Sequence, residues 1–485
     1  MRPLLQEVAT TQTPETLARI LSGAPGVVAL HSSRFDAAQG RFSFITAWPF
    51  LHFRSFGSRC ELNEPSGDTK VHYGNPWRVL ESLLPRFELL DEIDLPFPLG
   101  GCFGFWGYEL KSFLEPRLQR HAANDLELPD CQLGLYSSLV AFDHQLGRAW
   151  VISTGLAADG TRHERRAREE FERWRAVLEA PRPAELPVAR GAARTVQPRG
   201  NLTKDAFISR VKRAQAYIRA GDIYQVNLCQ RLTTEWSSPP IQLFSGLSAL
   251  SPAPFAAWLD EGDFQIASSS PELFLKLSGS HVQTRPIKGT RPRDSDSARD
   301  AQLAYELQTS PKEVAELIMI TDLLRNDLGK VCEYGSVKVP ELLRLERYAQ
   351  VQHLVSTVEG RLRQGISHLE AFAACFPGGS VTGAPKLRAM ELIDELEPVA
   401  RGPYTGALGY LGFNRESQLS IVIRAAICKA GAAHFYTGAG IVADSVPEAE
   451  YEETLAKARG FTDVLTLENA TFARSGSRAS QARRA

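Results

Sequence analysis

Short apolar runs typical of β-strands follow one another along this chain without a helix regularly placed between them. In the first part of the chain, the runs VVALHSS, RFSFITAW, LGLYSSLVAFD and RAWVIST are separated by glycine-rich turns. In the second part, strand-like runs such as FQIASSS and LSIVIRAAIC are mixed with helices of clear 3.6-residue period. Because doubly wound folds alternate strands and helices regularly, this order predicts an α+β fold with antiparallel sheets.

Two segments lack an apolar period and divide the chain. Residues 181–200 are rich in Pro, Ala, Gly and Arg, which is typical of a linker. Residues 470–485 have the composition of a disordered basic tail. We therefore expect two structured parts, residues 1–180 and residues 201–469.

Composition excludes several classes of protein. The 485 residues include 55 Lys+Arg and 56 Asp+Glu, and this balance argues against a nucleic-acid or membrane-surface binder. No apolar run reaches the ~20 residues that a membrane span needs, and no signal peptide is recognisable before Glu7. The seven cysteines form no C-x-x-C pair, which argues against a zinc ribbon and a disulfide scaffold. We expect a cytoplasmic protein.

Two expected helices present paired carboxylates. One begins at the capping box Ser310–Glu313, and the other begins at the similar box Ser445–Glu448. Each carries two glutamates spaced i, i+3, which places both on one helical face about 5–6 Å apart. These glutamates are Glu313 and Glu316 on the first helix, and Glu450 and Glu453 on the second.

The glutamate pairs allow two interpretations. Either they cap the helices and face solvent, or the two helices face each other and their carboxylates form an oxygen site. Such a site suits Mg²⁺, which prefers one or two carboxylates together with waters and substrate oxygens. Because Glu313 is engaged in capping, Glu316 and Glu453 are the better metal candidates.

A lysine and a glutamate at strand ends are candidates for chemistry. Lys288 lies in RPIKGT and is either an exposed lysine in a basic loop or a group presented to a ligand. A nucleophilic lysine requires desolvation or neighbouring positive charge to lower its pKa. Glu272, in SSSPELF, is either a solvated turn residue or a general acid with a raised pKa.

Glycine-rich segments add anion-binding features. FPGGSVTGAPK (376–386) has the glycine spacing of a P-loop, but Ala384 stands where that motif requires lysine. Its backbone N–H groups, like those of YTGAGI (436–441), can still cradle an anion. Arg424 is a cation at the end of an apolar strand. Together these features indicate an anion pocket beside a metal, hence a small polycarboxylate ligand.

Taken together, these segments resemble the chorismate-utilising enzymes, and among them aminodeoxychorismate synthase component I. The matching runs cover nearly the whole second part in unbroken order. They are GDIYQVN (221–227), SSSPELF (268–274), RPIKGTRPR (285–293), AELIMITDLLRND (315–327), YGSVKVPEL (334–342), QHLVSTVEG (352–360), FPGGSVTGAPKLRAMELIDELEP (376–398), GYLGF (409–413), IVIR (421–424) and GAGIVADSVPEAEYEET (438–454). In the first part, which would be an anthranilate-synthase-like domain, the resemblance rests on SSRFD (32–36) and GGCFGFWGYEL (100–110).

The resemblance implies a fold and a set of site residues. The fold is a large sandwich of antiparallel sheets flanked by helices, with the active site between the sheets. Glu316 and Glu453 match the Mg²⁺ ligands, with Glu313 and Glu450 as their helical neighbours, and Glu272 matches the acid that protonates the departing C4 hydroxyl. The residues that match the chorismate pocket are Gly289, Thr290, His353, Ser380, Tyr410, Arg424, Gly438, Ala439 and Gly440, with Arg424 on a substrate carboxylate.

Two positions distinguish the branches of this family. Isochorismate- and salicylate-forming relatives carry a lysine base where Gln225 stands, so this site suits ammonia rather than water. Anthranilate synthases usually carry alanine in place of Lys288, which is similar to the nucleophile of aminodeoxychorismate synthases. The resemblance thus implies that chorismate and ammonia give 4-amino-4-deoxychorismate, in the p-aminobenzoate and folate pathway.

Alternatives and partners complete these expectations. Anthranilate synthase component I, in the tryptophan pathway, is the second candidate, and a non-catalytic ligand-binding protein is a third. Ser32 and Ser33 lie where relatives bind tryptophan, although His31 replaces the usual acidic residue. Because no cysteine lies in the G-x-C-x-G elbow of a glutaminase, we expect a separate glutamine amidotransferase subunit to supply ammonia.

Overall fold

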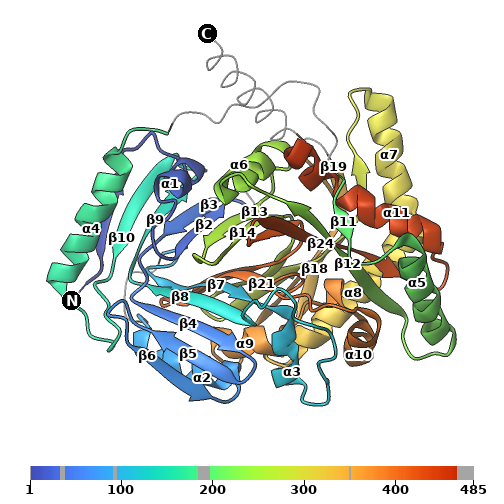
Figure 1. The fold of residues 1–485 in the computed structure, drawn as a ribbon, viewed down its shortest axis with the longest axis horizontal. Helices are drawn as coiled ribbons and strands as arrows, with labels where there is room; N and C mark the ends of the chain where they lie inside the picture. Colours follow the sequence, from blue (N-terminus) through green and yellow to red (C-terminus); the bar gives the residue numbers. More distant parts are fainter. Residues whose placement is uncertain (1, 33–38, 91–94, 184–196, 349–350, 467–485) are drawn as a thin grey trace, which may run out of the picture.

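Two large antiparallel sheets form the protein, with helices on their outer faces (Figure 1). The computed structural model describes residues 2–32, 39–90, 95–183, 197–348 and 351–466. Each sheet contains 12 strands. The expected α+β sandwich of antiparallel sheets is therefore confirmed. No helix within the described ranges is long and apolar enough to cross a membrane.

The first sheet combines strands from both parts of the chain. Its order is β1 (Leu4–Val8), β10 (Arg148–Ser153), β9 (Ser138–Asp143), β3 (Phe42–Thr46), β2 (Val27–His31), β13 (Phe255–Asp260), β14 (Phe264–Ser270), β23 (Ala425–Lys429), β24 (Ala432–Ile441), β12 (Gln225–Glu235) and β11 (Arg199–Gly200), and β20 (Gly383–Ala384) also pairs with β12. β2 meets β13 with His31 opposite Ala256. The two parts of the chain join at this pair.

The second sheet is built in the same way. Its order is β17 (Ile287–Pro292), β19 (Val351–Arg361), β16 (His281–Arg285), β15 (Leu273–Ser278), β22 (Glu416–Ile421), β21 (Ala407–Gly412), β7 (Gly101–Trp106), β8 (Cys131–Tyr136), β4 (Leu51–Phe56), β5 (Arg59–Asn63) and β6 (Thr69–Tyr73), and β18 (Lys338–Arg347) also pairs with β19. Here β7 meets β21, with Phe103 opposite Tyr410. The division of the chain at residues 181–200 stays a prediction, but strands from both sides of it share both sheets. Most of that linker, and the expected tail at 470–485, lie outside the described residues.

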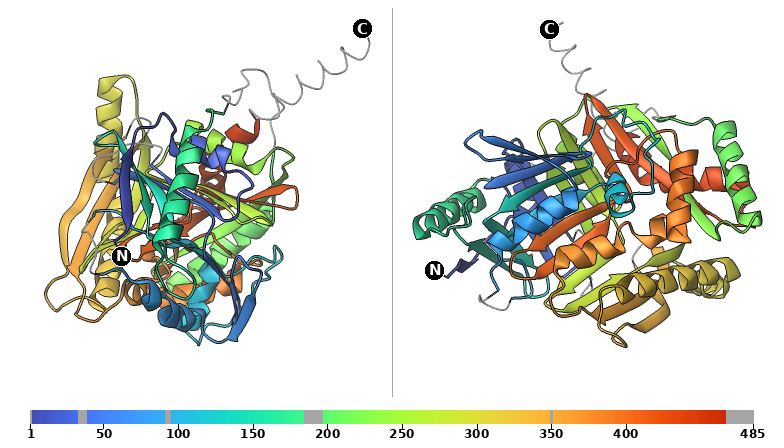
Figure 2. Two further views of the ribbon diagram at one scale, coloured as in Figure 1. Left: turned by 90° about the vertical axis from the view of Figure 1, so that its left-hand side faces the viewer. Right: turned by 90° about the horizontal axis from the view of Figure 1, so that it is seen from below.

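Helices cover the outer faces of the sheets. They are α1 (Pro14–Ile20), α2 (Pro76–Leu83), α3 (Lys111–Leu114), α4 (Glu164–Glu179), α5 (Lys204–Arg219), α6 (Pro240–Leu250), α7 (Ser297–Thr309), α8 (Pro311–Gly329), α9 (His368–Cys375), α10 (Lys386–Leu396) and α11 (Pro447–Lys457). The amphipathic α4 packs its buried Phe171 and Trp174 over β9 and β10 (Figure 2). Helices α5, α7 and α11 lie at the opposite end of the molecule from α4 (Figure 1).

Aromatic side chains fill the space between the sheets. Tyr410 stacks on Phe103, with ring centroids 5.2 Å apart, and meets Phe44 edge-on at 5.3 Å. All three are buried. Such pairs contribute about 0.5–1.5 kcal/mol each beyond the burial of their surface, so this layer fixes the distance between the sheets.

Two of the places where the chain passes from one sheet to the other are neighbours. Glu272 lies between β14 of the first sheet and β15 of the second, and Arg424 lies between β22 of the second and β23 of the first. The Ser269 N–H donates to the Arg424 carbonyl (2.9 Å), and the Ile421 N–H donates to the Glu272 carbonyl (3.1 Å). The prediction of one strand over 419–428 is therefore wrong, because an apolar run continues unchanged while its strand changes sheets.

The two expected capping boxes have different outcomes. At Ser310 the serine half of the box forms, since the Ser310 hydroxyl accepts a hydrogen bond from the Glu313 N–H (3.5 Å). The Glu313 carboxylate is recorded with Arg291 instead of the Ser310 N–H among the described residues. The box at Ser445 is wrong, because Val446 is the N-cap residue of α11 and makes no side-chain cap. The Ser445 hydroxyl instead donates to Glu450 Oε1 (2.7 Å). A buried carboxylate needs such a donor more than an exposed helix end does.

Candidate active site

Lys288 on β17 reaches toward α8. Its Nζ lies 3.3 Å from Glu316 Oε2, and the Gln225 amide donates to the same oxygen (3.4 Å). A Cβ added at Gly440 on β24 would collide with that amide and lie 3.5 Å from Lys288 Nζ. The structure therefore brings together four residues that the sequence identified separately, from β12, β17, β24 and α8.

A bulge after Lys288 shapes this end of β17. The pairing of β17 with β19 shifts between Lys288 and Thr290, and Gly289 has φ +69°. A Cβ at Gly289 would collide with Leu307 and lie 3.0 Å from Glu313 Oε2. Only glycine suits this backbone and this close approach to α8. The bulge re-aims Lys288 relative to the regular strand.

Glu272 is a buried acid beside these groups. Its side chain is 6% exposed. Burial raises the pKa of Glu272 to about 7, although a hydrogen bond from Ser380 and the charge of Lys288 both act to lower it. A carboxyl with this pKa holds its proton for part of the time at neutral pH, as a general acid must. The predicted acid, Ser380 and Lys288 are therefore neighbours.

Arg424 presents a cation at the neighbouring crossover. Within the described residues, no carboxylate or hydrogen-bond acceptor is recorded against its guanidinium, and burial lowers its pKa. By contrast, the buried Arg401 pairs with Glu397 (2.6 Å) and also donates to Thr405 (3.1 Å). A partly desolvated guanidinium without an anion favours binding of a carboxylate ligand.

The glutamates of α8 and α11 are each paired with a cation. Glu450 Oε1 lies 3.4 Å from Lys312 Nζ, and Glu453 Oε1 lies 2.7 Å from Lys457 Nζ. Glu313 lies 3.5 Å from Arg291 instead of facing α11. Burial acts to raise the pKa of Glu453, but the nearby lysines 457, 312 and 288 lower it overall.

These carboxylates fit a magnesium ion chemically. Within the described ranges, no three acidic, histidine or cysteine side chains are grouped closely enough to hold a metal as they stand. However, Glu450 is 3% exposed, and its Oε2 has no hydrogen-bond partner in the part of the chain that the structure describes. An all-oxygen donor set with a free buried acceptor suits Mg²⁺. The assignment of Glu316, Glu453, Glu313 and Glu450 as metal ligands stays a prediction.

Other predicted pocket residues lie on the strands next to Lys288. The Thr290 hydroxyl and His353 Nδ1 are 2.9 Å apart across β17 and β19. Gly438 and Gly440 lie on β24 opposite Cys229 and Asn227 of β12. Ala439 alternates with these glycines, and its side chain packs in the core beneath α5 and α10. Only its backbone remains available to a ligand.

Tyr410 and Ser32 lie at a different place between the sheets. A cavity there, which we call the seam cavity, lies beside the β2–β13 junction. Its lining residues are Leu30, His31, Ser32, Phe42, Phe44, Pro254, Phe255, Ala256, Leu408, Gly409, Gln418 and Ser420. Tyr410 packs on Phe44, which lines this cavity, and makes no recorded contact with Lys288 or Glu272. Ser33 lies outside the described residues.

Two contributions to the site were missed from the sequence. Lys312 was overlooked, although a lysine four residues before Glu316 must share its helical face. Glu346 on β18 was also overlooked. It binds Arg285 (2.5 Å), three residues before Lys288, and accepts from Gln39 (3.2 Å) of the N-terminal part. No local pattern marked Glu346, because its partners are distant in sequence.

Comparisons with known proteins agree with this site. The chorismate binding enzyme family matches residues 39–463. Anthranilate synthase component 1 of Synechocystis sp. is 38% identical over 96% of both chains, and aminodeoxychorismate synthase component 1 of Bacillus subtilis is 38% identical over 81% of this chain and 83% of its own. The crystal structure of anthranilate synthase component I from Streptococcus pneumoniae superposes with a TM-score of 0.77 at 30% identity, covering 88% of this chain and 94% of the other.

A more distant structure shares the fold. The menaquinone-specific isochorismate synthase of Escherichia coli is 19% identical, with a TM-score of 0.71 over 96% of this chain and 94% of its own. The site combines a buried acid, a lysine paired with a carboxylate, and an arginine with no anion recorded among the described residues. The chain belongs to the chorismate binding enzyme family. It is a chorismate-utilising enzyme of the group that includes anthranilate synthase and aminodeoxychorismate synthase.

Proposed function

We propose that this protein is aminodeoxychorismate synthase component I, which converts chorismate and ammonia into 4-amino-4-deoxychorismate for p-aminobenzoate and folate synthesis. The observation that carries the proposal is the position of Lys288. Its ammonium group lies between Glu316 and Gly440 and acts on the pKa of Glu272. The 38% identity to the Bacillus subtilis aminodeoxychorismate synthase supports the same assignment.

In this mechanism Lys288 is the nucleophile and Glu272 is the acid. Deprotonated Lys288 Nζ forms a bond to C2 of chorismate, and the C4 hydroxyl leaves with the proton of Glu272 as water. Ammonia then attacks C4, the double bond shifts back, and the C2–N bond to Lys288 breaks. Burial raises the pKa of Glu272 to about 7, so the acid carries a proton at the pH where ammonia transfer must occur.

The remaining groups orient the substrate. Arg424 would bind a substrate carboxylate, because its guanidinium has no recorded anion among the described residues. Thr290 and His353, joined at 2.9 Å, would fix the wall of the pocket beside the bulge. Glu316 and Glu453, with Glu313 and Glu450 nearby, would hold Mg²⁺, which supplies Lewis-acid stabilisation of charge at the ring carboxylate.

Ammonia would come from a separate glutamine amidotransferase. A glutaminase needs an accessible thiolate. All seven cysteines of this chain are buried, and burial raises the pKa of Cys428 to about 12 and of Cys375 to about 12. These thiols are unsuited to that role, which supports a heterodimer in which this chain contributes only the chorismate site.

Anthranilate synthase component I is the second candidate. It is favoured by relatives such as the Synechocystis enzyme, which matches 96% of both chains. The two functions differ in their products, because anthranilate formation releases pyruvate and aminodeoxychorismate formation does not.

The deciding experiment is product analysis. The full chain is incubated with chorismate, Mg²⁺ and ammonium, and the products are identified by mass spectrometry. We expect 4-amino-4-deoxychorismate without pyruvate; anthranilate with pyruvate would overturn the assignment. Without ammonium, intact-protein mass spectrometry should detect an adduct that Lys288→Ala abolishes. The exposed Lys276 of β15 provides a matched control, so Lys276→Ala should retain the adduct.

A further inference from the structure

We propose that Lys312 is an internal counter-ion of the acidic site, which neutralises Glu450 in the metal-free protein and is displaced when a divalent cation binds the glutamates of α8 and α11. This inference rests on the metal ligands of the proposed function. It adds a residue that competes with the metal, and it predicts the direction in which that residue sets metal affinity.

The contact between the two helices is direct. Lys312 Nζ on α8 lies 3.4 Å from Glu450 Oε1 on α11. The Glu450 side chain is 4% exposed, and that of Lys312 is 48% exposed. Ser445 donates to the same Oε1 (2.7 Å), whereas Oε2 has no hydrogen-bond partner among the described residues. One hydroxyl does not compensate a buried carboxylate, so a cation is required beside Glu450.

The position of Lys312 is unfavourable on its own helix. Lys312 lies in the first turn of α8, two residues after the N-cap Ser310. The helix dipole disfavours positive charge at this end. The lysine is therefore placed to serve groups outside the first turn: Glu316 one turn along α8, and Glu450 across on α11.

Each glutamate has a cation, but the three cations differ. Glu316 is paired with Lys288 (3.3 Å), which the proposed reaction uses as nucleophile. Glu453 is paired with Lys457 (2.7 Å) on its own helix, where the lysine also donates to the Gly438 carbonyl (2.9 Å). Among these three lysines, Lys312 is the one that joins α8 to α11 without a proposed part in the reaction.

A cation in this position must oppose a metal. A divalent ion held by the glutamates of α8 and α11 would share the Glu450 carboxylate with the Lys312 ammonium group, which lies 3.4 Å from it. Removing a unit charge about 4–6 Å from a divalent ion strengthens its binding roughly tenfold or more. The same removal leaves the glutamates of the metal-free protein to repel one another.

The test measures metal binding directly on the full chain. Mn²⁺ serves as probe, and its dissociation constant is measured by electron paramagnetic resonance without chorismate. We expect Lys312→Met to bind Mn²⁺ roughly tenfold more tightly than the wild type. Lys312→Arg keeps the charge and should bind as the wild type does. In metal-free buffer, Lys312→Met should melt at a lower temperature and gain more from added Mn²⁺.

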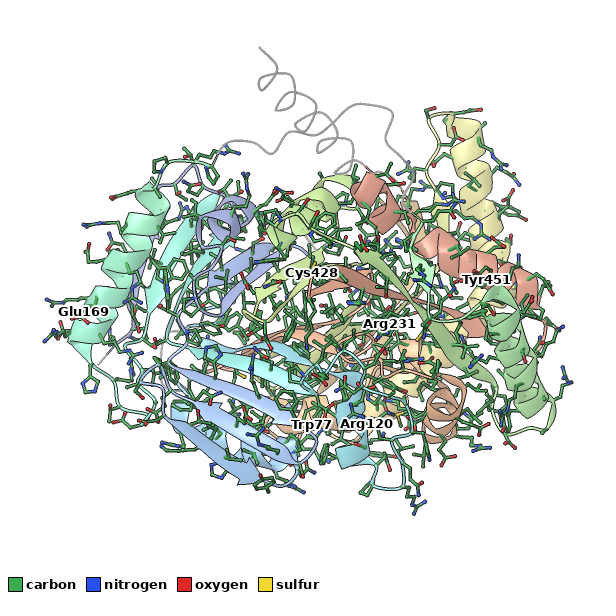
Figure 3. The ribbon with its side chains drawn as sticks, in the orientation of Figure 1. Trp77, Arg120, Glu169, Arg231, Cys428 and Tyr451 are labelled. Carbon is green, nitrogen blue, oxygen red and sulfur yellow. The ribbon has the colours of Figure 1, made fainter. Side chains whose placement is uncertain are left out.

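Lys204 provides a matched control. Its Nζ lies 2.7 Å from the exposed Glu452 of α11 and 5.4 Å from the centre of the Tyr451 ring. Figure 3 labels Tyr451 on α11. Lys204→Met therefore removes a similar ion pair outside the site and should leave Mn²⁺ affinity unchanged. Unchanged or weaker binding by Lys312→Met would overturn the inference alone, provided that Glu316→Gln weakens binding. Binding that is unaffected by Glu316→Gln would overturn both the inference and the metal assignment.

Discussion

The catalytic cluster around Lys288 and the seam cavity around His31 each bring together residues of both sheets. In the catalytic cluster, Lys288 is paired with Glu316, and Glu450 is paired with Lys312. In the seam cavity, the described residues provide no recorded acidic partner for His31, and its buried Nδ1 has no hydrogen-bond partner among them. Burial, and to a smaller extent the charge of His144, lower the pKa of His31 to about 4.

This difference shows how charged groups are stabilised in the interior of the protein. Both regions remove ionisable groups from water, which disfavours the charged form of each. In the cavity this cost leaves a neutral imidazole among the rings of Phe42, Phe44 and Phe255. In the cluster, opposite charges from β17, α8 and α11 compensate one another. Pairing, not burial alone, distinguishes the reactive region, and the following predictions test that distinction.

The largest expected effect follows from replacing the buried acid of the cluster. Glu272→Gln should lower kcat by about 10²–10⁴, because the amide cannot protonate a leaving hydroxyl. The carboxyl of Glu261 provides a control near the other end of β14, since burial also raises its pKa to about 7. Glu261→Gln should leave kcat unchanged in the same assay. Equal losses in the two variants would show that the acid role is misplaced.

The same acid should set the pH dependence. The pKa of Glu272 is raised to about 7 in the folded chain, so activity should fall about tenfold per pH unit above 7. Between pH 4.5 and 7, Glu272 is protonated in the folded state and ionised in the unfolded state. The free energy of unfolding should therefore decrease as the pH rises through this window. Denaturant unfolding should find Glu272→Gln more stable than the wild type at pH 8, by on the order of 2–3 kcal/mol. The difference should vanish at pH 4.

A smaller effect tests whether the regions are connected. Glu346 binds Arg285 (2.5 Å) on β16 of the second sheet, and it accepts a hydrogen bond from Gln39 (3.2 Å) of the N-terminal part. Glu346→Gln should lower the free energy of unfolding by about 2 kcal/mol, because Arg285 loses its nearest anion. It should also lower kcat without abolishing it, since Lys288 is three residues away.

Gln39→Ala separates these two contributions. It removes the contact with the N-terminal part and keeps the Arg285 ion pair. Chemical denaturation and steady-state kinetics should place it closer to the wild type than Glu346→Gln. A loss of kcat as large as that of Glu346→Gln would mean that the N-terminal contact, and not the ion pair, positions Lys288.

The smallest effect concerns the seam cavity. The Ser32 hydroxyl lies within hydrogen-bond distance of the carbonyls of Phe42 (3.2 Å) and Pro254 (3.0 Å) and can donate to either. Ser32→Ala should lower the free energy of unfolding by about 1 kcal/mol and leave kcat unchanged. Tryptophan binding in this cavity predicts that the amino acid raises the melting temperature of the wild type and not of Ser32→Ala. The same rise in both proteins would place tryptophan elsewhere.

Local patterns predicted much of this molecule because local forces determine those parts. The apolar period and the Ser310 cap identified α8, and the strand-like runs identified an antiparallel α+β fold. The change of sheet between Ile421 and Ala425 was not predictable in this way. Buried strands in either sheet have the same apolar character, so the sequence does not mark where one ends and the other begins.

The sequence identified which residues belong to the site better than it identified the residues that each of them contacts. Lys288, Glu272 and Glu316 stood out by type and position. The pairing of Lys312 with Glu450 depends on how two segments 138 residues apart face each other. The Ser445 hydroxyl, by contrast, turns to a carboxylate only five residues along the chain. Tyr410 is the opposite case. The GYLGF motif around it matches the family, but its ring packs in the aromatic layer on Phe103 and not beside Lys288.

The joining of β2 to β13 and of β7 to β21 limits how this chain can be subdivided. A fragment that begins after residue 200 would expose the bare edges of β13 and β21, each with unsatisfied backbone groups ready to recruit foreign strands. Cutting at the linker would therefore yield an aggregation-prone piece instead of an independent catalyst. A chimaera of two relatives would likewise have to keep the N-terminal and C-terminal parts of the same parent, because their strands pair with each other in both sheets.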